Sequence, residues 1–392
     1  MKKNINILII ATGMPKYDLN SGDLRFYTII KILAENFNIY YFCTSDRDKG
    51  SRYAEKLKQL GIEIHFGSSS FSDILRSNKY ILAFFEFYYT INYYVDRLRI
   101  LQPECRIVVD TVDIHYMRLL MKYSLTKNEN DLRIMEETRL KEISAYEKAD
   151  LLITVTEDDA VALKDEMKYF NYYVIPNVHD IVISDMPVQK NTLIFVGGFN
   201  HEPNVDAMVY FCKQVFPLIR EKYNVNLVIV GSNPPEQVQT LNNTHITVTG
   251  FVESTTPYLH SSYISIAPLR FGAGMKGKIG EAMAHGLPVV TTSVGAQGMG
   301  LEHGVNILIA DSERDFADSV LQLLFNDELY EKISKNSLQF VQENYTTELV
   351  EIKLKYMVDT IMDIPAMKMT VKDKIMFLYL YLLQRIRPNK QG

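Results

Sequence analysis

The stretch that decides the fold is Ser262–Thr292, which reads SYISIAPLRFGAGMKGKIGEAMAHGLPVVTT. It predicts four elements in order: a buried strand over 263–267, a glycine-rich loop over 272–274, a helix over 276–285 and a strand over 288–292. Gly286 stands where a helix needs a left-handed residue to end, and Pro288 prevents the helix from continuing. Strand, loop, helix and strand in this order are typical of a doubly wound parallel sheet.

The same alternation extends outward in both directions and falls into two series. The first series has predicted strands over 5–10, 39–42, 62–65, 80–85, 107–109, 151–155 and 172–175, with a helix over about 22–35. The second has predicted strands over 192–196, 226–230, 246–249, 263–267, 288–292 and 307–309. The residues after Pro176-Asn177 have weak periodicity, so we expect two Rossmann-like domains joined near residue 180, with ligands in the cleft between them.

We divide the chain on this basis. The predicted parts are an N-terminal acceptor-binding domain over 1–178, a C-terminal donor-binding domain over 179–345, a crossover helix over 346–365 and a basic amphipathic tail over 366–392. The tail has six basic residues and one acid around the apolar run 375–383. Such a run is too short to span a bilayer, so we expect it either to lie on a membrane surface or to dock on protein, including a second subunit.

Composition excludes several classes of protein. The chain has 392 residues, 47% of them hydrophobic, and a formal net charge of −5, which fits a globular protein and argues against a dedicated nucleic-acid binder. Its 3 cysteines show neither metal spacing nor a disulfide framework. The apolar start reads as a first strand and not as a signal peptide, so we expect a cytoplasmic protein, with peripheral attachment at the inner face of the cell membrane as an option.

The loop and helix of the first stretch form an anion trap. Backbone N–H groups at a helix N-terminus are unpaired, and the helix dipole favours a negative charge there. Lys276 and Lys278 place two cations in this first turn, where a helix alone disfavours them, so we expect an anion to bind. Glu281 follows one turn later and is placed to accept hydrogen bonds from a ribose diol, although an ordinary exposed helix glutamate is the alternative.

Two other motifs are weaker. The residues Gly272-x-Gly274-x-x-Gly277 match the dinucleotide fingerprint, but the strand that follows ends in Thr291-Thr292-Ser293, without the acid that this fingerprint requires. The pair Asp46-x-Asp48 lies in a charged segment and is better explained as a solvated loop than as a metal site. We therefore predict no metal and no nicotinamide cofactor.

The chain resembles the family-4 retaining glycosyltransferases with the GT-B fold, also described as group 1 glycosyl transferases, over roughly residues 5–362. The segment around the glycine loop is similar to their donor-binding signature, in a variant with a Gly-Ala-Gly loop. Further similar segments are Asp110–His115, Ala149–Glu157, Val174–Val178 and Phe195–Phe199 with Pro203-Asn204.

The resemblance implies roles for particular residues. Glu281 holds the ribose of a nucleotide diphosphate sugar, Lys276 and Lys278 neutralise its diphosphate, and the amides of Gly272, Ala273 and Gly274 face the sugar or phosphate. Further donor-binding positions implied by the resemblance are Gly198, Gly22 and Arg25. His115 is expected at the reacting sugar, with Asp113 orienting it or contacting the acceptor. A structural histidine and a turn-capping aspartate are the alternatives for these two residues.

Two departures from the family pattern bear on function. Ala273 stands where the family commonly has a second glutamate, separated from Glu281 by seven residues, and Phe199-Asn200-His201-Glu202 replaces the usual Arg and Lys after the Gly-Gly turn. We predict a metal-independent retaining hexosyltransferase that moves a sugar to a glycan or lipid-linked acceptor in surface polysaccharide or glycan assembly. The alternatives are a non-catalytic partner subunit, which Ala273 keeps open, and a nucleotide-sugar epimerase.

Overall fold

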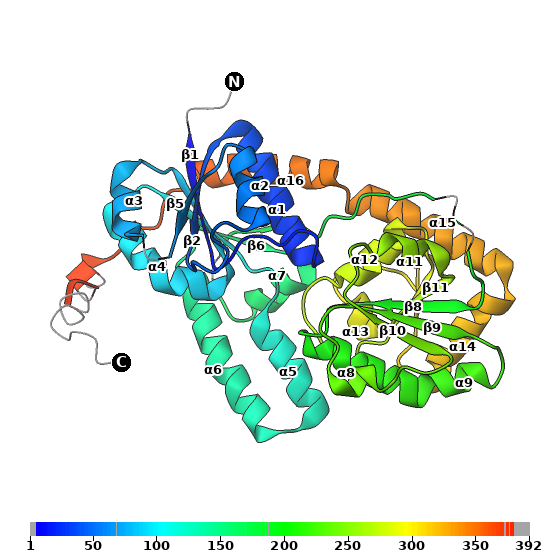
Figure 1. Cartoon of the computed structure of the whole chain (residues 1–392). Coiled ribbons are helices and arrows are strands. Elements are labelled where there is room, and N and C mark those ends of the chain that lie inside the picture. Colours follow the sequence, from blue (N-terminus) through cyan, green and yellow to red (C-terminus); the bar gives the residue numbers. More distant parts are fainter. Residues whose placement is uncertain are drawn as a thin grey trace.

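The computed structural model describes residues 5–67, 69–168, 170–184, 186, 188–371, 374–375 and 377–379. Figure 1 shows two lobes side by side, each with its own sheet. Most of the tail predicted over 366–392 lies outside the described residues. In the part that the structure describes, no helix is long and apolar enough to cross a membrane.

The described residues of the first lobe form a seven-stranded parallel sheet in the order β3-β2-β1-β4-β5-β6-β7. The strands are β1 (Asn6–Ala11), β2 (Asn38–Cys43), β3 (Glu63–Phe66), β4 (Leu82–Glu86), β5 (Arg106–Asp110), β6 (Leu151–Thr154) and β7 (Tyr172–Val174). They agree with the predicted strands to within two residues, because continuous β-branched and aromatic runs are typical of strands covered on both faces.

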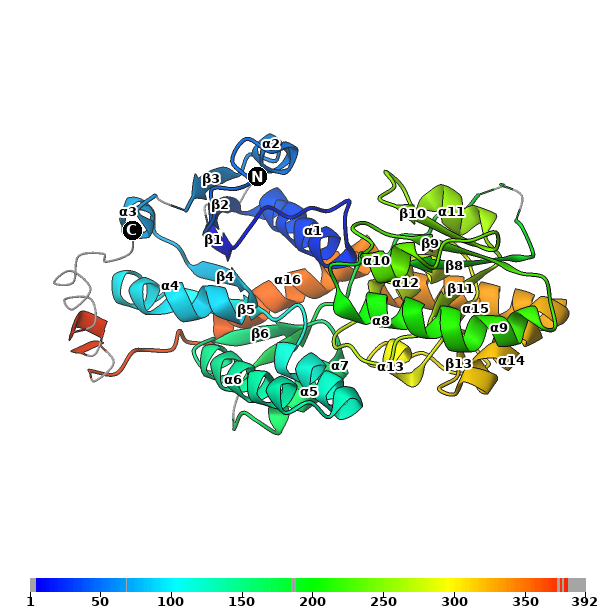
Figure 2. The same cartoon turned by 60° about the horizontal axis from the view of Figure 1, so that its bottom comes forward.

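Helices cover both faces of this sheet (Figure 2). They are α1 (Ser21–Asn36), α2 (Arg52–Gln59), α3 (Phe71–Ser77), α4 (Phe87–Leu101), α5 (His115–Thr126), α6 (Glu129–Tyr146) and α7 (Glu157–Lys164). Buried side chains of α1 and α2 pack in one core with one face of the strands, and those of α3, α4 and α6 pack in a second core with the other face. Helices α5 and α6 form a hairpin that projects from the lobe (Figure 1).

The described residues of the second lobe form a six-stranded sheet in the order β10-β9-β8-β11-β12-β13. Its strands, again parallel, are β8 (Thr192–Val196), β9 (Asn226–Val230), β10 (Ile246–Gly250), β11 (Ile264–Ala267), β12 (Val289–Thr291) and β13 (Leu308–Ile309). The predicted fold class, two doubly wound Rossmann-like domains, is confirmed.

The helices of the second lobe complete this arrangement. They are α8 (Glu202–Tyr210), a π-helical turn (Phe211–Val215), α9 (Phe216–Arg220), α10 (Glu236–Gln239), α11 (Thr256–Ser261), α12 (Gly277–Ala284), α13 (Ser293–Ala296), α14 (Glu313–Phe325) and α15 (Asp327–Asn344). Helix α12 ends as the sequence predicts, because Gly286 has a φ of 69°. Helices α11, α12 and α15 share one core, whereas α8, α9 and α14 lie in the other.

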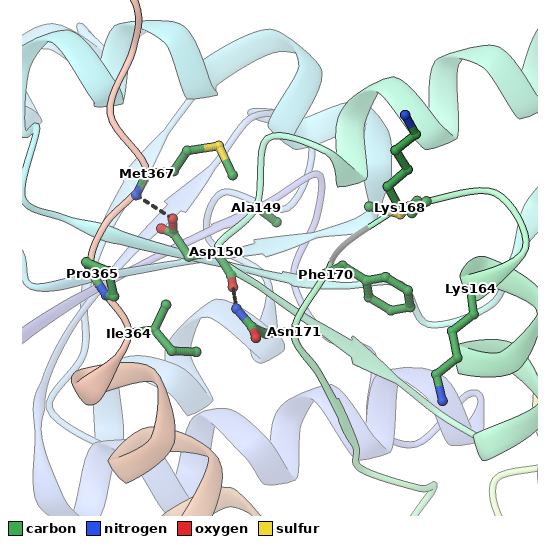
Figure 3. A pocket seen from close by; sticks show the side chains of 10 residues that line it. Ala149, Asp150, Lys164, Lys168, Phe170, Asn171, Ile364, Pro365 and Met367 are labelled. Atoms are coloured by element: carbon green, nitrogen blue, oxygen red, sulfur yellow. Dashed lines mark hydrogen bonds between the residues drawn. The ribbon is translucent and has the colours of Figure 1, made fainter.

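The chain then returns to the first lobe. Helix α16 (Thr347–Asp363) buries Val350, Leu354 and Met357 in the core that α1 also lines. Beyond α16, the Arg106 guanidinium donates to the carbonyls of Met362 and Ile364, at 2.8 Å each, and the Met367 amide donates to Asp150 at 2.7 Å. Figure 3 shows this last contact, which holds the start of the C-terminal segment at the amino end of β6.

Candidate functional site

The loop between β11 and α12 lies at the carboxyl end of β11 and leads into the N-terminus of α12. Gly272 and Gly274 have φ values of 146° and 66°, which side chains strongly disfavour. The residue before the helix, Lys276, makes no side-chain cap, and the first turn of α12 has no acidic residue. The helix therefore presents its N-terminal amides without a carboxylate beside them, as an anion site requires.

Both predicted lysines lie at this helix start. The ammonium of Lys276, a residue only 7% exposed, donates to the carbonyls of Gly272 and Gly274 at 3.3 and 2.7 Å. The ammonium of Lys278 donates to the side-chain oxygen of Asn204 and lies 4.7 Å from the ring centre of Phe195. Among the described residues, neither ammonium has a carboxylate within ion-pair distance, so two cations share this pocket of polar groups without a counterion.

Their environment favours the neutral amines. Burial, together with a smaller effect from the nearby charge of Lys276, lowers the pKa of Lys278 to about 7. Burial also lowers the pKa of Lys276 to about 8, although the charges of Asp159 and Asp113 oppose this shift. A bound dianion would reverse both effects, because it stabilises the charged form of each amine.

Glu281 lies one turn into α12. Its carboxylate accepts a hydrogen bond of 2.5 Å from the Thr255 hydroxyl, which comes from the segment before α11. Burial raises the pKa of Glu281, and this hydrogen bond only partly offsets the shift. A buried carboxyl group with a single neutral partner retains capacity to accept hydrogen bonds from a diol.

The starts of α12 and α1 meet where the two lobes touch. A Cβ placed on Gly277 would lie 1.8 Å from the Ser21 hydroxyl, so only glycine permits this approach. Gly22 lies beside Ser21 in the first turn of α1, near the side chain of Val112. The structure therefore brings Gly22 to the lobe boundary close to α12, where the resemblance expects it.

Asp113 and His115 follow β5 on the other side of this boundary. Asp113 lies against the glycine loop, since a Cβ on Gly274 would be 3.0 Å from its Cβ. Its carboxylate contacts His115 Nε2 at 2.8 Å and Arg118 at 2.5 Å. Burial opposes ionisation of Asp113, but these partners outweigh it and lower its pKa. The structure thus joins the two predicted residues in one hydrogen-bonded group.

Arg25 does not lie where the sequence placed it, and we correct this assignment. Its side chain is fully buried, donates to Asp110 Oδ2 at 2.7 Å and donates to the Ile175 carbonyl at 2.8 Å. A cation that already has a buried carboxylate partner, with no exposed surface, is not available to a phosphate. Arg25 lies on the side of α1 that faces the sheet, where its side chain meets Asp110 at the end of β5.

Gly198 and Ala273 are more exposed parts of the same region. The Gly198 carbonyl accepts a 2.7 Å hydrogen bond from Asn204 Nδ2, and the oxygen of the same amide accepts from Lys278. Asn204 therefore fixes the position of Lys278 relative to the turn after β8. The sequence motif contained Asn204, but only the fold brings it to Lys278. The side chain of Ala273 adds no polar group to the loop.

Residues that the sequence did not single out also join the lobes. A Cβ on Gly298 would lie 2.8 Å from the Thr156 side chain, and the Lys122 ammonium of α5 contacts Glu202 of α8 at 3.0 Å. A Cβ on Gly280 of α12 would lie 2.3 Å from the buried ring of His179, which belongs to the segment that joins the lobes. Small residues in a helix are the sequence signal for such contacts, but they do not identify the partner.

A separate pocket lies away from this boundary. Its volume is about 540 Å³, and it is lined by Asp150, Lys164, Phe170, Ile364 and Met367 among others. Figure 3 shows that the C-terminal segment forms one wall and the segment leading to β7 another. This pocket lies at the amino end of β6, whereas Asp113 and His115 of the candidate site follow the carboxyl end of β5. The two therefore lie at opposite ends of the strands of the first sheet.

Comparison with known proteins gives the class. Residues 190–326 match the family model described as glycosyl transferases group 1. An uncharacterised 44.6 kDa protein from the cps region of Klebsiella pneumoniae is 27% identical over 186 residues, which cover 45% of this chain. The matched part spans 48%, about half, of that curated relative.

Solved structures extend the comparison to both lobes. Sucrose-phosphate synthase from Thermosynechococcus elongatus has a TM-score of 0.70 at 16% identity, with 92% of this chain and 99% of that chain covered. HepE of Anabaena, solved with UDP and glucose, has a TM-score of 0.68 at 14% identity, with 91% and 100% covered. The pneumococcal O-GlcNAc transferase GtfA, solved with UDP and GlcNAc, has a TM-score of 0.70 at 10% identity, with 92% and 99% covered.

These similarities define a GT-B protein. The chain has the GT-B fold, and the part of its second lobe over residues 190–326 is similar to the group 1 glycosyl transferases. The candidate site lies at the edge of that domain where it meets the first lobe.

Proposed function

We propose that the protein is a retaining glycosyltransferase that moves a hexosyl group from a nucleotide diphosphate sugar to an acceptor hydroxyl. The observation that carries this proposal is the pair of buried Lys276 and half-buried Lys278 at the start of α12, whose ammonium groups form no ion pair with a carboxylate in the part of the chain that the structure describes. Burying a cation is costly unless something pairs with it, and a diphosphate supplies charge of the required sign and amount.

The difficult step is departure of the nucleotide diphosphate. The bond from the anomeric carbon to the phosphate oxygen breaks while charge grows on the diphosphate, and the two lysines with the amides of α12 stabilise that charge. The acceptor oxygen then bonds to the anomeric carbon on the face that the leaving group vacates. The acceptor's proton passes to the leaving phosphate. Because lysines and amides provide the charge, we expect activity to persist in EDTA.

The donor and the biological setting are proposed from the relatives. HepE and GtfA were solved with UDP, which makes UDP-sugars the first donors to test. The relative encoded in a cps region favours assembly of a surface polysaccharide, with a glycan or lipid-linked acceptor. We propose a cytoplasmic site of action, with peripheral attachment at the inner face of the membrane, or contact with a second subunit, through residues 366–392.

The direct test is a donor screen by nucleotide release with purified protein, followed by two substitutions. Lys278→Ala and Glu281→Ala should each lower kcat/KM for the donor at least about tenfold, or about 1.4 kcal/mol, because each removes a contact to the diphosphate or ribose. Lys332→Ala, on the exposed surface of α15, is the matched control and should keep full activity. Unchanged turnover in both site variants would refute the assignment.

The same screen separates the alternatives. An epimerase would convert the nucleotide sugar without an acceptor. Chromatography separates the two epimers, and mass spectrometry then identifies them. A non-catalytic subunit would bind no nucleoside diphosphate in calorimetry. The Asp113–His115 pair beside the glycine loop favours a catalytic protein, since a partner subunit has no use for an oriented imidazole there.

A further inference from the structure

Three aromatic residues at the start of α4 surround His115 on the side away from the donor loop. The ring centres of Phe87, Tyr88 and Tyr89 lie 5.6, 5.3 and 6.4 Å from that of His115. The rings of Phe87 and Tyr89 stack with centres 5.2 Å apart and planes only 19° apart. Offset stacking is one of the arrangements that aromatic pairs prefer, and here it places two nearly parallel rings beside a polar pair.

The backbone holds this cluster in an unfavourable conformation. Phe87 has a φ of 63° where β4 runs directly into α4, and Val112 has a φ of 60° just after the neighbouring strand β5. Left-handed backbone costs energy for residues with bulky or β-branched side chains and tends to persist at functional sites. The two strained residues flank the group formed by Asp113 and His115, so the strain fixes how rings and polar pair face each other.

The cluster is also accessible. Tyr89 is 38% exposed, and its hydroxyl pairs with the Thr12 side chain in the loop after β1. Gly274 of the donor loop also contacts Asp113. Contacts therefore run from the donor loop to Asp113, from Asp113 to His115 and from His115 to the stacked rings, which is the order that a donor sugar and an acceptor would need.

We propose that Phe87 and Tyr89 form a stacking platform for a pyranose ring of the acceptor, and that one of its hydroxyls is thereby directed to Asp113 and His115. This inference rests on the proposed function and makes the acceptor a glycan that is recognised by its sugar ring. The C–H groups on the less polar face of a pyranose carry positive charge that the negative face of an aromatic ring attracts. A phosphate group has no C–H face and would gain no such contact.

The test uses saturation-transfer NMR on the full-length protein with saturating UDP. The probes are methyl pyranosides of glucose, galactose, mannose and N-acetylglucosamine, with glycerol 3-phosphate as a probe that has no sugar ring. At least one pyranoside should receive saturation through its ring C–H protons. Tyr89→Ala should weaken that binding about three- to tenfold, and Tyr89→Phe, which keeps the ring, should retain it.

Tyr93→Ala is the matched control, because Tyr93 lies on the same helix, is 79% exposed and has its ring against that of Tyr94. It should bind the pyranosides as the unmodified protein does. The melting temperature of each variant separates lost binding from lost structure. Equal saturation in Tyr89→Ala and unmodified protein, transfer only to glycerol 3-phosphate, or no transfer to any pyranoside would each overturn the platform.

Calorimetry with UDP, done on the same samples, keeps the two proposals apart. Tyr89→Ala should bind UDP with unchanged affinity, because the ring of Tyr89 contacts those of Phe87, Tyr88 and His115, and none of these residues is proposed to hold the diphosphate. If the unmodified protein does not bind UDP, the proposed function is contradicted. If it binds UDP but the pyranosides bind equally well to Tyr89→Ala, only the platform is contradicted.

Discussion

The protein has two places where cations are buried near the lobe boundary, and they differ in their partners. In the first lobe, the Arg25 guanidinium and the Asp110 carboxylate form a fully enclosed ion pair at 2.7 Å. In the second lobe, Lys276 and Lys278 lie side by side with carbonyl and amide oxygens as their hydrogen-bond partners. In both places the cations lie near the start of a helix that follows a strand. Position in the fold therefore does not distinguish the two places.

The difference separates a structural charge from a binding charge. A buried cation with its own carboxylate is electrically complete, and removing either partner leaves an unpaired charge. Two cations without a carboxylate have their pKa values lowered and can recover that cost by binding an anion. The comparison therefore predicts that substitutions at the first place lower stability, whereas those at the second lower the affinity for an anionic ligand.

The largest expected effect is on stability. Arg25→Met should lower the free energy of unfolding by about 3–5 kcal/mol, because it leaves Asp110 buried without its partner. Urea denaturation measures this change. Arg52→Met is the control, since Arg52 forms an exposed pair with Asp18 and its loss should cost no more than about 1 kcal/mol. Equal stability of the two variants would remove the distinction between the two places.

A smaller effect is expected where the lobes touch. Gly277→Ala should cost about 1–3 kcal/mol in the free energy of unfolding or in donor affinity, because its methyl group would overlap Ser21. The double variant Ser21→Gly, Gly277→Ala should recover most of that loss, since it removes the overlapping atoms. A double-mutant cycle measures the coupling, and additive effects would show that the two helix starts do not approach each other in solution.

A third expected effect depends on pH. Because the folded protein lowers the pKa of Lys278 to about 7 and the unfolded chain has an ordinary value of about 10.4, the unfolded chain binds more protons between these values. Stability therefore rises with pH across this window. Lys278→Met removes the buried charge, so it should stabilise the protein most near pH 6.5 and least near pH 10. Urea denaturation at both pH values tests this, and a variant that is less stable at pH 6.5 contradicts it.

Much of the fold could be predicted from the sequence because buried parallel strands have a strong local signal. The strands 192–196 and 226–230 have the predicted bounds. Helix α12 begins and ends within one residue of its predicted bounds. What could not be predicted depends on contacts between distant residues. Arg25 appeared available to phosphate because nothing local shows that Asp110 lies against it.

The candidate site divides in the same way. Lys276, Lys278 and Glu281 are neighbours on one helix, so their spacing alone predicts that they share a site. Asn204, Ser21 and Tyr89 reach it from other elements, and no local pattern links them to α12. No local pattern shows that the rings at the start of α4 stack beside His115, and the left-handed backbone of Phe87 appears only in the structure.

The most direct test of the central claim is calorimetry of UDP, and of GDP if UDP does not bind, at pH 8 in Tris and in HEPES. The diphosphate is fully ionised there, so protons exchanged on binding belong to the protein. If the diphosphate pairs with the two lysines, their pKa values rise and binding takes up about one proton, which appears as a heat that depends on the buffer. Lys278→Met should lose most of this uptake and bind at least about tenfold more weakly. Tight binding with no proton uptake, and with equal affinity in Lys278→Met, would contradict the account.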